Sequence, residues 1–162
     1  MYTVRRAKTS DREAIVSLWT ELIQLHQKLD SRFDPISNSA ELYADHLKEL
    51  LRSHDAAIFV ATTNLNQQII GFIVAEIRPH PPFTKPGLYG YILDIFVVEQ
   101  FRNRGVGAAL VKAVQEWFQA KHIVSIQLFV STSNQLSAAF WQKMGFTDFM
   151  SLMSCELASP LA

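Results

Sequence analysis

The sequence has 162 residues and a single cysteine, Cys155. One cysteine cannot form an internal disulfide, and the paired Cys/His spacings of zinc sites do not occur. We therefore expect a reducing, cytoplasmic setting and no bound metal. Cys155 lies in an apolar segment without an obvious base beside it, so we expect a core residue rather than a nucleophile.

An excess of charge of either sign is also missing. Lysine and arginine together number 15, aspartate and glutamate number 15, and the formal net charge is zero. Proteins that neutralise many backbone phosphates usually carry a basic excess, so we expect no nucleic-acid partner.

Long apolar runs are absent as well. No run reaches the ~18 residues of a membrane-spanning helix, so we expect no membrane partner. The basic residues Arg5, Arg6 and Lys8 are not followed by an apolar signal-peptide core. The apolar fraction of 49% is typical of a globular chain, and the length suits one domain over residues 1–162.

The hydrophobic pattern alternates between strand-like and helix-like segments. A capping box of Ser10 and Glu13 predicts the start of a helix that runs to Leu29, with Ala14, Leu18, Leu22 and Leu25 on its buried stripe. Further helices are predicted from Asn38 to Leu51, with Leu42, Leu47 and Leu50 buried, over Val106–Ala120, and over Gln135–Met144, which Gly145 should end. Strands are predicted over Tyr2–Lys8, Ala56–Thr62, Ile69–Ile77, Tyr89–Val98, Val124–Val130 and Phe146–Glu156. This order indicates an α/β (α+β mixed) fold, with a mixed sheet covered by helices.

The most informative segment runs from Arg102 to Gly107 (RNRGVG), between an apolar strand and an amphipathic helix. A helix start leaves four backbone N–H groups without partners and carries about half a positive charge. A pyrophosphate satisfies both, the glycines permit close approach, and the arginines add charge. The segment is neither a Walker loop nor a dinucleotide fingerprint. The plain alternative is that the two glycines only shape a turn.

This segment resembles the pyrophosphate motif of the GNAT superfamily of N-acetyltransferases, Gln/Arg-x-x-Gly-x-Gly/Ala, through Arg102, Gly105 and Gly107. A second match lies downstream, where Asn134 precedes Ala138-Ala139-Phe140-Trp141-Gln142-Lys143-Met144-Gly145-Phe146. The resemblance implies a mostly antiparallel sheet with a central splayed strand pair, flanked by four helices. It also implies acetyl-CoA as co-substrate. A homodimer stays open, because dimers are common in the family although no feature here indicates one.

The resemblance further implies a set of cofactor contacts. Backbone of Ile95, Phe96 and Val97 would lie beside the acetyl and pantetheine groups, with the Phe96 N–H as oxyanion donor. Asn134 would bond near the pantetheine arm, and Trp141 would line the pocket. The backbone cradle for the pyrophosphate would be Arg102, Asn103, Arg104, Gly105, Val106, Gly107 and Ala108.

One departure from the family concerns the acid that protonates the leaving thiolate. Trp141 stands where many members have a tyrosine, and an indole N–H has no useful acidity. Ser137, one helical turn earlier, could donate a hydrogen bond instead, against the alternative of an ordinary helix-surface serine.

Candidate acceptor-site residues follow from chemistry. Asp94 is the one acid in an apolar strand, where burial is costly without a partner, and could accept the amine proton. His26 could be a second base, and Tyr91 could contact the acceptor. For each, the alternative is a structural or surface role.

The sequence thus predicts direct acetyl transfer from acetyl-CoA to a primary amine, on a small molecule or a peptide, in a ternary complex. Two alternatives are an acyl-CoA-binding sensor with little catalysis and an unrelated nucleotide-binding or interaction domain. The acceptor is left open among polyamines, aminoglycosides, amino acids and protein N-termini.

Overall fold

The computed structural model describes residues 1–81 and 87–155. One mixed sheet runs in the order β1-β2-β3-β4-β5. The first four strands pair antiparallel, and β4 pairs with β5 in parallel. The strands are β1 (Tyr2–Arg6), β2 (Ala56–Thr63), β3 (Ile69–Pro79), β4 (Leu88–Val97) and β5 (Ile126–Gln127). The four predicted N-terminal strands and the mixed fold class are therefore confirmed.

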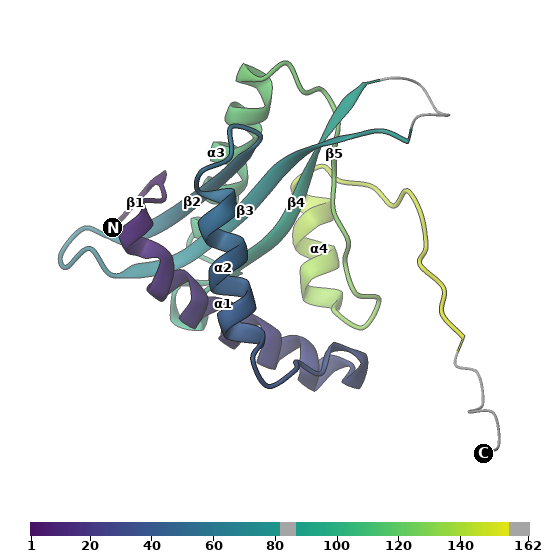
Figure 1. Ribbon diagram of the computed structural model, residues 1–162, viewed down its shortest axis with the longest axis horizontal. Coiled ribbons are helices and arrows are strands. Elements are labelled where there is room, and N and C mark those ends of the chain that lie inside the picture. Colours follow the sequence, from purple (N-terminus) through teal and green to yellow (C-terminus); the bar gives the residue numbers. More distant parts are fainter. Residues whose placement is uncertain (82–86, 156–162) are drawn as a thin grey trace.

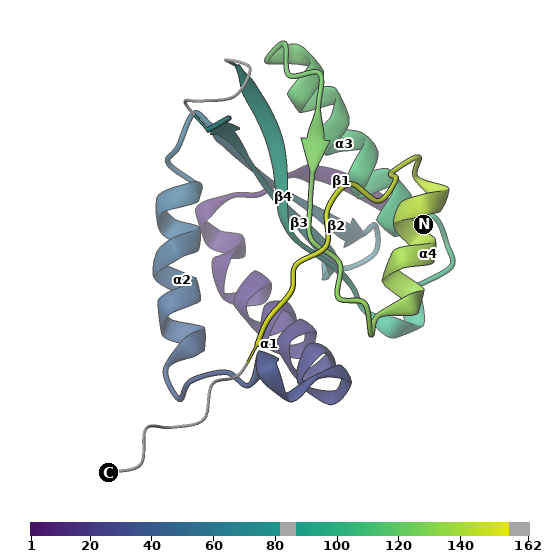
Figure 2. The same cartoon turned by 90° about the vertical axis from the view of Figure 1, so that its right-hand side faces the viewer.

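Helices cover both faces of the sheet (Figures 1 and 2). Within the described residues they are α1 (Arg12–Leu29), α2 (Ser39–Leu50), α3 (Val106–Ala120) and α4 (Gln135–Lys143), with 3-10 turns at Thr9–Asp11, Ser31–Phe33 and Glu99–Phe101. One buried cluster joins α1 and α2 to the sheet, and a second joins α3 and α4 to the opposite face. None of the helices in the described ranges is long and apolar enough to cross a membrane.

The predicted stripes on α1 and α2 need correction. On α1 the buried positions are Ile15, Leu18 and Leu22, whereas Ala14 is exposed, because the stripe begins one residue later. On α2, Leu42 is 52% exposed, and Tyr43 takes the buried position instead. Gly145 ends α4 as predicted, with a φ of 89° directly after the cap.

The centre of the sheet is irregular in β4. Val74 and Ala75 of β3 are adjacent, but they pair with Asp94 and Ile92, so Leu93 is an extra residue in a β-bulge. A bulge bends its strand and increases the local twist. On its other edge β4 pairs with β5 only at Gly90 and Tyr91, and the two strands then separate.

The predictions for the last two strands are wrong: the first is much shorter than predicted and the second does not form in the described residues. Val124–Val130 contributes only Ile126 and Gln127, since its partner β4 turns away; Val124 is 96% exposed. Residues 146–155 form no strand, and the remaining Glu156 lies outside the described residues. In this segment Phe149, Met150, Leu152 and Met153 are 74–90% exposed. Cys155 is exposed too, so the prediction of a core residue is wrong.

The chain enters α1 through Asp11 rather than through the predicted Ser10–Glu13 capping box. The Asp11 carboxylate accepts the Lys8 backbone N–H at 2.7 Å and two Arg5 guanidinium N–H groups at 2.7 and 3.0 Å. The Arg5 hydrogen bonds lower the pKa of Asp11. Because the Asp11 side chain is only 10% exposed, this ion pair is better shielded than most at a surface.

We expect Asp11→Ala to lower the free energy of unfolding by about 1–2 kcal/mol, since it removes a cap and leaves Arg5 unpaired. Urea denaturation at pH 7 measures this loss. A lowered carboxyl pKa stabilises the fold above the unfolded-state pKa, and that stabilisation disappears as the pH falls through the folded-state value. The difference in free energy of unfolding between the wild type and Asp11→Ala should therefore become smaller as the pH falls toward 3. The exposed Asp45 on α2 supplies the control variant Asp45→Ala, and equal losses in both variants would contradict the argument.

Candidate functional site

The separation of β4 from β5 leaves one edge of β4 open in the middle of the fold. The Val98 N–H donates to Ile70 O of β3 at 3.0 Å. Two residues before Val98 on the same strand, Phe96 pairs with Phe72 of β3. Hydrogen-bonded and non-hydrogen-bonded pairs alternate along an antiparallel ladder. The Phe96 N–H is therefore turned toward β3, and the N–H groups of its two neighbours, Ile95 and Val97, point to the open edge.

This geometry corrects the predicted oxyanion donor. The Phe96 carbonyl also faces β3, since a Cβ atom on Gly71 would lie 2.8 Å from its oxygen. Phe96 is 6% exposed and belongs to the core on the α1/α2 side. The donors that remain at the open edge are Ile95 and Val97.

Beyond β4, the loop from Arg102 to Gly105 turns the chain into α3. Asn103 and Gly105 both have left-handed φ values, 58° and 82°. The Arg102 N–H donates to Glu99 O, and the Ala109 N–H donates to Gly105 O. Between them, no N–H of residues 103–108 has a partner among the described residues. These amides at the N-terminus of α3 form a concentrated set of free donors, as an anion site requires.

The two loop glycines are needed for different reasons. Gly105 has a φ of 82°, which side-chain-bearing residues rarely adopt, and a Cβ there would lie 3.2 Å from the Tyr2 hydroxyl. A Cβ on Gly107 would meet the Phe140 ring at 3.3 Å. The second glycine thus allows α4 to pack closely against the start of α3, which brings the two predicted motifs together.

The two arginines of the loop differ. Arg102 donates from Nε to Val97 O at 2.9 Å, with its guanidinium 5.4 Å from the Phe96 ring centroid. Its side chain thus lies along the open edge of β4. Arg104 is exposed and has its guanidinium 5.9 Å from the Phe101 ring centroid. Of these two arginines, only Arg104 has a guanidinium without a hydrogen-bond partner among the described residues.

The α4 residues have partly structural roles. Asn134 is the N-cap, and its Oδ1 accepts the Ser137 backbone N–H at 3.0 Å, while its Nδ2 has no partner in the described part of the chain. Ser137 is half-buried one turn into the helix. Trp141 is 5% exposed and packs edge-on against Phe140 and Phe146, so it is mainly a core residue.

Asp94 lies on the face of the sheet that α1 and α2 cover. The Tyr43 hydroxyl of α2 donates to Asp94 Oδ2 at 2.9 Å. The bulge explains this placement, because it turns Leu93 and Asp94 toward the same face although they are adjacent. Burial raises the pKa of Asp94, and the Tyr43 hydrogen bond and the charge of His46 oppose the rise.

Among the described residues, the charge that lowers the pKa of Asp94 is that of His46, which forms no ion pair with it. No lysine or arginine among residues 1–81 and 87–155 forms an ion pair with it. Oδ1 has no hydrogen-bond partner, yet no fully enclosed side-chain oxygen or nitrogen of the described residues lacks one. Oδ1 is therefore open to solvent. A carboxylate with a raised pKa, one fixed oxygen and one open oxygen suits proton transfer.

The two remaining candidates, Tyr91 and His26, make no hydrogen bond to Asp94 in the described part of the chain. Tyr91 is half-buried on β4, under the Arg78 guanidinium at 3.6 Å and edge-on to Phe129. His26 packs against Phe33, and burial lowers its pKa. No contact joins His26 to Asp94.

Sequence reasoning missed Tyr43 and Trp19, whose rings stack with centroids 4.1 Å apart and an interplanar angle of 10°. The one available signal was the spacing of Tyr43, which stands four positions before Leu47 and therefore on the same face of α2.

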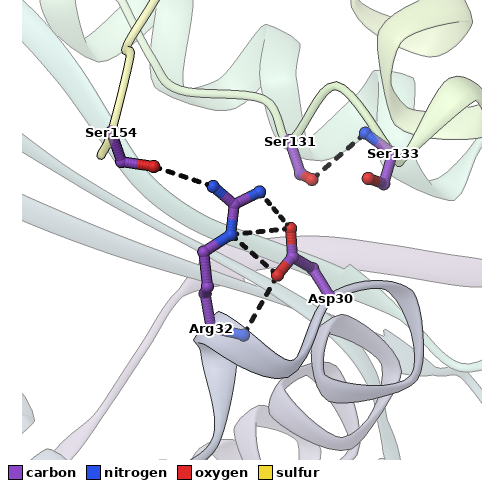
Figure 3. A network of polar contacts seen from close by, with 5 residues as sticks. All are labelled: Asp30, Arg32, Ser131, Ser133 and Ser154. Atoms are coloured by element: carbon purple, nitrogen blue, oxygen red, sulfur yellow. Dashed lines mark hydrogen bonds and ion pairs between the residues drawn. The ribbon is translucent and has the colours of Figure 1, made fainter. Parts of the chain in front are cut away.

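Asp30, at the end of α1, belongs to a separate surface network. Figure 3 shows the Arg32 guanidinium pointing at both Asp30 and Ser154 of the C-terminal segment. The Arg32 hydrogen bonds lower the pKa of Asp30 to about 2. Across the described ranges, no three His, Cys, Asp or Glu side chains gather as they would to hold a metal ion.

Comparison with known proteins agrees with the resemblance to N-acetyltransferases that the sequence shows. In sequence, the chain is 27% identical over 158 residues to an N-alpha-acetyltransferase of Sulfurisphaera tokodaii, covering 91% of this chain and 81% of the relative. It is 28% identical over 93 residues to an aminoglycoside N(6')-acetyltransferase type 1 of Klebsiella aerogenes, covering 57% and 60% of the two chains.

In structure, the fold matches the BH1408 protein of Bacillus halodurans with a TM-score of 0.86, at 21% identity and with 96% and 99% of the two chains covered. It matches the aminoglycoside N-acetyltransferase AAC(6')-Iy, solved in complex with CoA, with a TM-score of 0.75, at 22% identity and with 98% and 96% covered. The model of the Acetyltransferase (GNAT) family matches residues 19–146. With its open central strand, its free amides at the start of α3 and this match over most of its length, the chain belongs to the GNAT family of acetyltransferases.

Proposed function

We infer that this protein transfers an acetyl group from acetyl-CoA to a primary amine by direct attack while both substrates are bound. The observation that carries the proposal is the set of N–H groups of residues 103–108 without partners, placed beside the open edge of β4. The family uses acetyl-CoA, and a pyrophosphate is the part of that molecule that such a set of donors fits.

The protein's groups suggest an order for the cofactor along this edge. The pyrophosphate would accept hydrogen bonds from the amides of residues 103–108, with Arg104 adding positive charge. The pantetheine arm would lie along the open edge near Val97, within reach of Asn134 Nδ2. The thioester carbonyl would accept the Ile95 N–H, which also stabilises the oxyanion that forms on attack.

Asp94 would act as the base. The acceptor arrives as an ammonium ion with a pKa near 10.4, and losing its proton at pH 7 costs about 4.6 kcal/mol. Asp94 Oδ1 takes this proton, directly or through water, and the neutral amine attacks the thioester carbon. A C–N bond forms and the C–S bond breaks. The nitrogen loses its second proton as the thiolate leaves; one of the two protons completes the CoA thiol and the other passes to solvent.

The leaving group does not require a strong acid. A thiol pKa near 8.5 makes thiolate a tolerable leaving group. Trp141 cannot supply a proton, and Ser137 is half-buried near the start of α4, where its hydroxyl could donate a hydrogen bond.

The charge around Asp94 favours a cationic acceptor. Because no lysine or arginine of the described residues pairs with this largely enclosed carboxylate, an ammonium ion would supply the missing counter-ion. The names of relatives include an N-alpha-acetyltransferase and aminoglycoside acetyltransferases. An acceptor panel should therefore contain aminoglycosides, polyamines, amino acids and peptide N-termini.

Four expectations from the sequence remain predictions. They are a single domain over residues 1–162, a cytoplasmic setting, a homodimer, and the absence of nucleic-acid and membrane partners.

The cofactor assignment predicts that acetyl-CoA, but not ATP, raises the melting temperature. A ligand at 100 times its Kd stabilises the native state by about 2.7 kcal/mol. Gly105→Ala should lose most of this stabilisation, because the change strains the loop that presents the amides. Gly145→Ala is a matched control, since Gly145 also has a left-handed φ and lies at the far end of α4. Equal ligand-induced shifts in the two variants would contradict the assignment.

The base assignment predicts that Asp94→Asn lowers kcat on the best amine at pH 7 by about 10²–10⁴, the usual contribution of a positioned base. Release of CoA thiol over the amine panel measures turnover, and the acetyl-CoA melting shift should be retained. Asp45→Asn, an exposed change on α2, should leave both unchanged. Full turnover in Asp94→Asn would remove the base assignment; a melting shift without thiol release from any amine would favour a binding module.

A further inference from the structure

Among the described residues, Tyr43 is the one side chain that donates a hydrogen bond to the candidate base. Its hydroxyl donates to Asp94 Oδ2 at 2.9 Å across 51 residues of sequence. Tyr43 is 8% exposed and belongs to the core between α1, α2 and the sheet. Burial, and secondarily the charge of Asp94, raise the pKa of Tyr43, so the hydroxyl stays protonated and always donates.

Trp19 on α1 holds Tyr43 in turn. The two rings stack nearly parallel, with centroids 4.1 Å apart. A buried ring stacked on another loses most of its rotational freedom, so the hydroxyl position is fixed by packing rather than by Asp94 alone. A chain of contacts therefore runs from α1 through α2 to one carboxylate oxygen on β4.

The two oxygens of Asp94 are thereby made unequal. Oδ2 is committed to Tyr43, and Oδ1 has no partner among the described residues and is open to solvent. A carboxylate accepts a proton most effectively when one lone pair is held toward the donor, and a fixed second oxygen restricts rotation about the Cβ–Cγ bond.

We propose that Tyr43 is a positioning residue for acetyl transfer: its hydroxyl fixes the Asp94 carboxylate through Oδ2 so that Oδ1 stays directed to the incoming amine. This inference rests on the proposed base role of Asp94. It assigns a function to a core tyrosine that is only 8% exposed.

Other groups also influence Asp94, and they define the background of the test. From α2 come Tyr43 and His46; Tyr91 is on β4 itself. On β3, Val74 faces Asp94, and Glu76 and Arg78 follow at the next positions of the same face, beside Tyr91. The α1 residues packed here are apolar or aromatic: Ile15, Leu18, Trp19 and Leu22. Tyr43 is the only hydrogen-bond donor to Asp94 in this set.

Tyr43→Phe tests the inference, because it removes the hydroxyl and keeps the stacked ring. A hydrogen bond to the charged form lowers a carboxyl pKa, so its loss should raise the pKa of Asp94 by about one unit. Carbon-13 NMR titration of protein labelled at aspartate carboxyls, with Asp94→Asn to assign the signal, measures this without any substrate. The acid limb of the kcat/KM profile should move to higher pH by the same amount. In the pH range where Asp94 is only partly ionised, this shift should lower kcat/KM by up to tenfold. On the alkaline plateau a smaller loss should remain, because the carboxylate is no longer held in one orientation.

Tyr89→Phe is the matched control, since Tyr89 lies on the same strand as Asp94 but contacts His80 instead. It should move neither the carboxyl signal nor the profile. An unchanged Asp94 pKa in Tyr43→Phe would overturn the inference while leaving the proposed function intact. A shifted carboxyl pKa with an unshifted rate profile would overturn the base role of Asp94, and the positioning role with it. A uniform loss at every pH, with the pKa of Asp94 unchanged, would show that Tyr43 acts only through packing.

Discussion

The arrangement of this protein depends on a hydrogen-bond ladder that stops early. β4 and β5 pair at two positions and then separate, which leaves the backbone donors of Ile95 and Val97 facing outward along the open edge of β4. Buried or half-buried main-chain donors are costly unless something accepts from them. An extended ligand with carbonyl groups can accept these bonds, which is why the proposed cofactor site lies where the ladder is interrupted.

The bulge at Leu93 joins the two halves of the chemistry. Without an extra residue, adjacent side chains alternate between faces, so Leu93 would lie on the face opposite to Asp94 and Phe96. With the bulge, Leu93 and Asp94 both lie on the α1/α2 side of the sheet. The backbone N–H groups of Ile95 and Val97, which follow directly, point to the open edge of β4. One strand can therefore hold a cofactor by its backbone and an acceptor by a side chain.

The sequence was sufficient for the four helices, for the first four strands and for the position of the glycine loop before α3, because hydrophobic period and Gly-x-Gly at a helix start are local signals. It was not sufficient for Phe96, because the direction of an N–H depends on the pairing register and on a bulge that no local pattern marks. Val124–Val130 and Phe146–Glu156 have strand-like composition, but a strand needs a partner, and β4 has turned away from the first of them. Cys155 was misplaced for the same reason, since it belongs to the unpaired segment.

The acceptor side shows where local reasoning stops. An acidic residue in an apolar strand is costly to bury without a partner, which is why Asp94 could be singled out from the sequence. Its solution, the Tyr43 hydroxyl, comes from a helix 51 residues away and is held there by a ring on another helix. The cofactor half of the site is built from consecutive residues and follows from a motif. The proposed acceptor half is assembled from α1, α2 and β4, so packing on α1 and α2 can alter the surroundings of Asp94 while the loop before α3 stays the same.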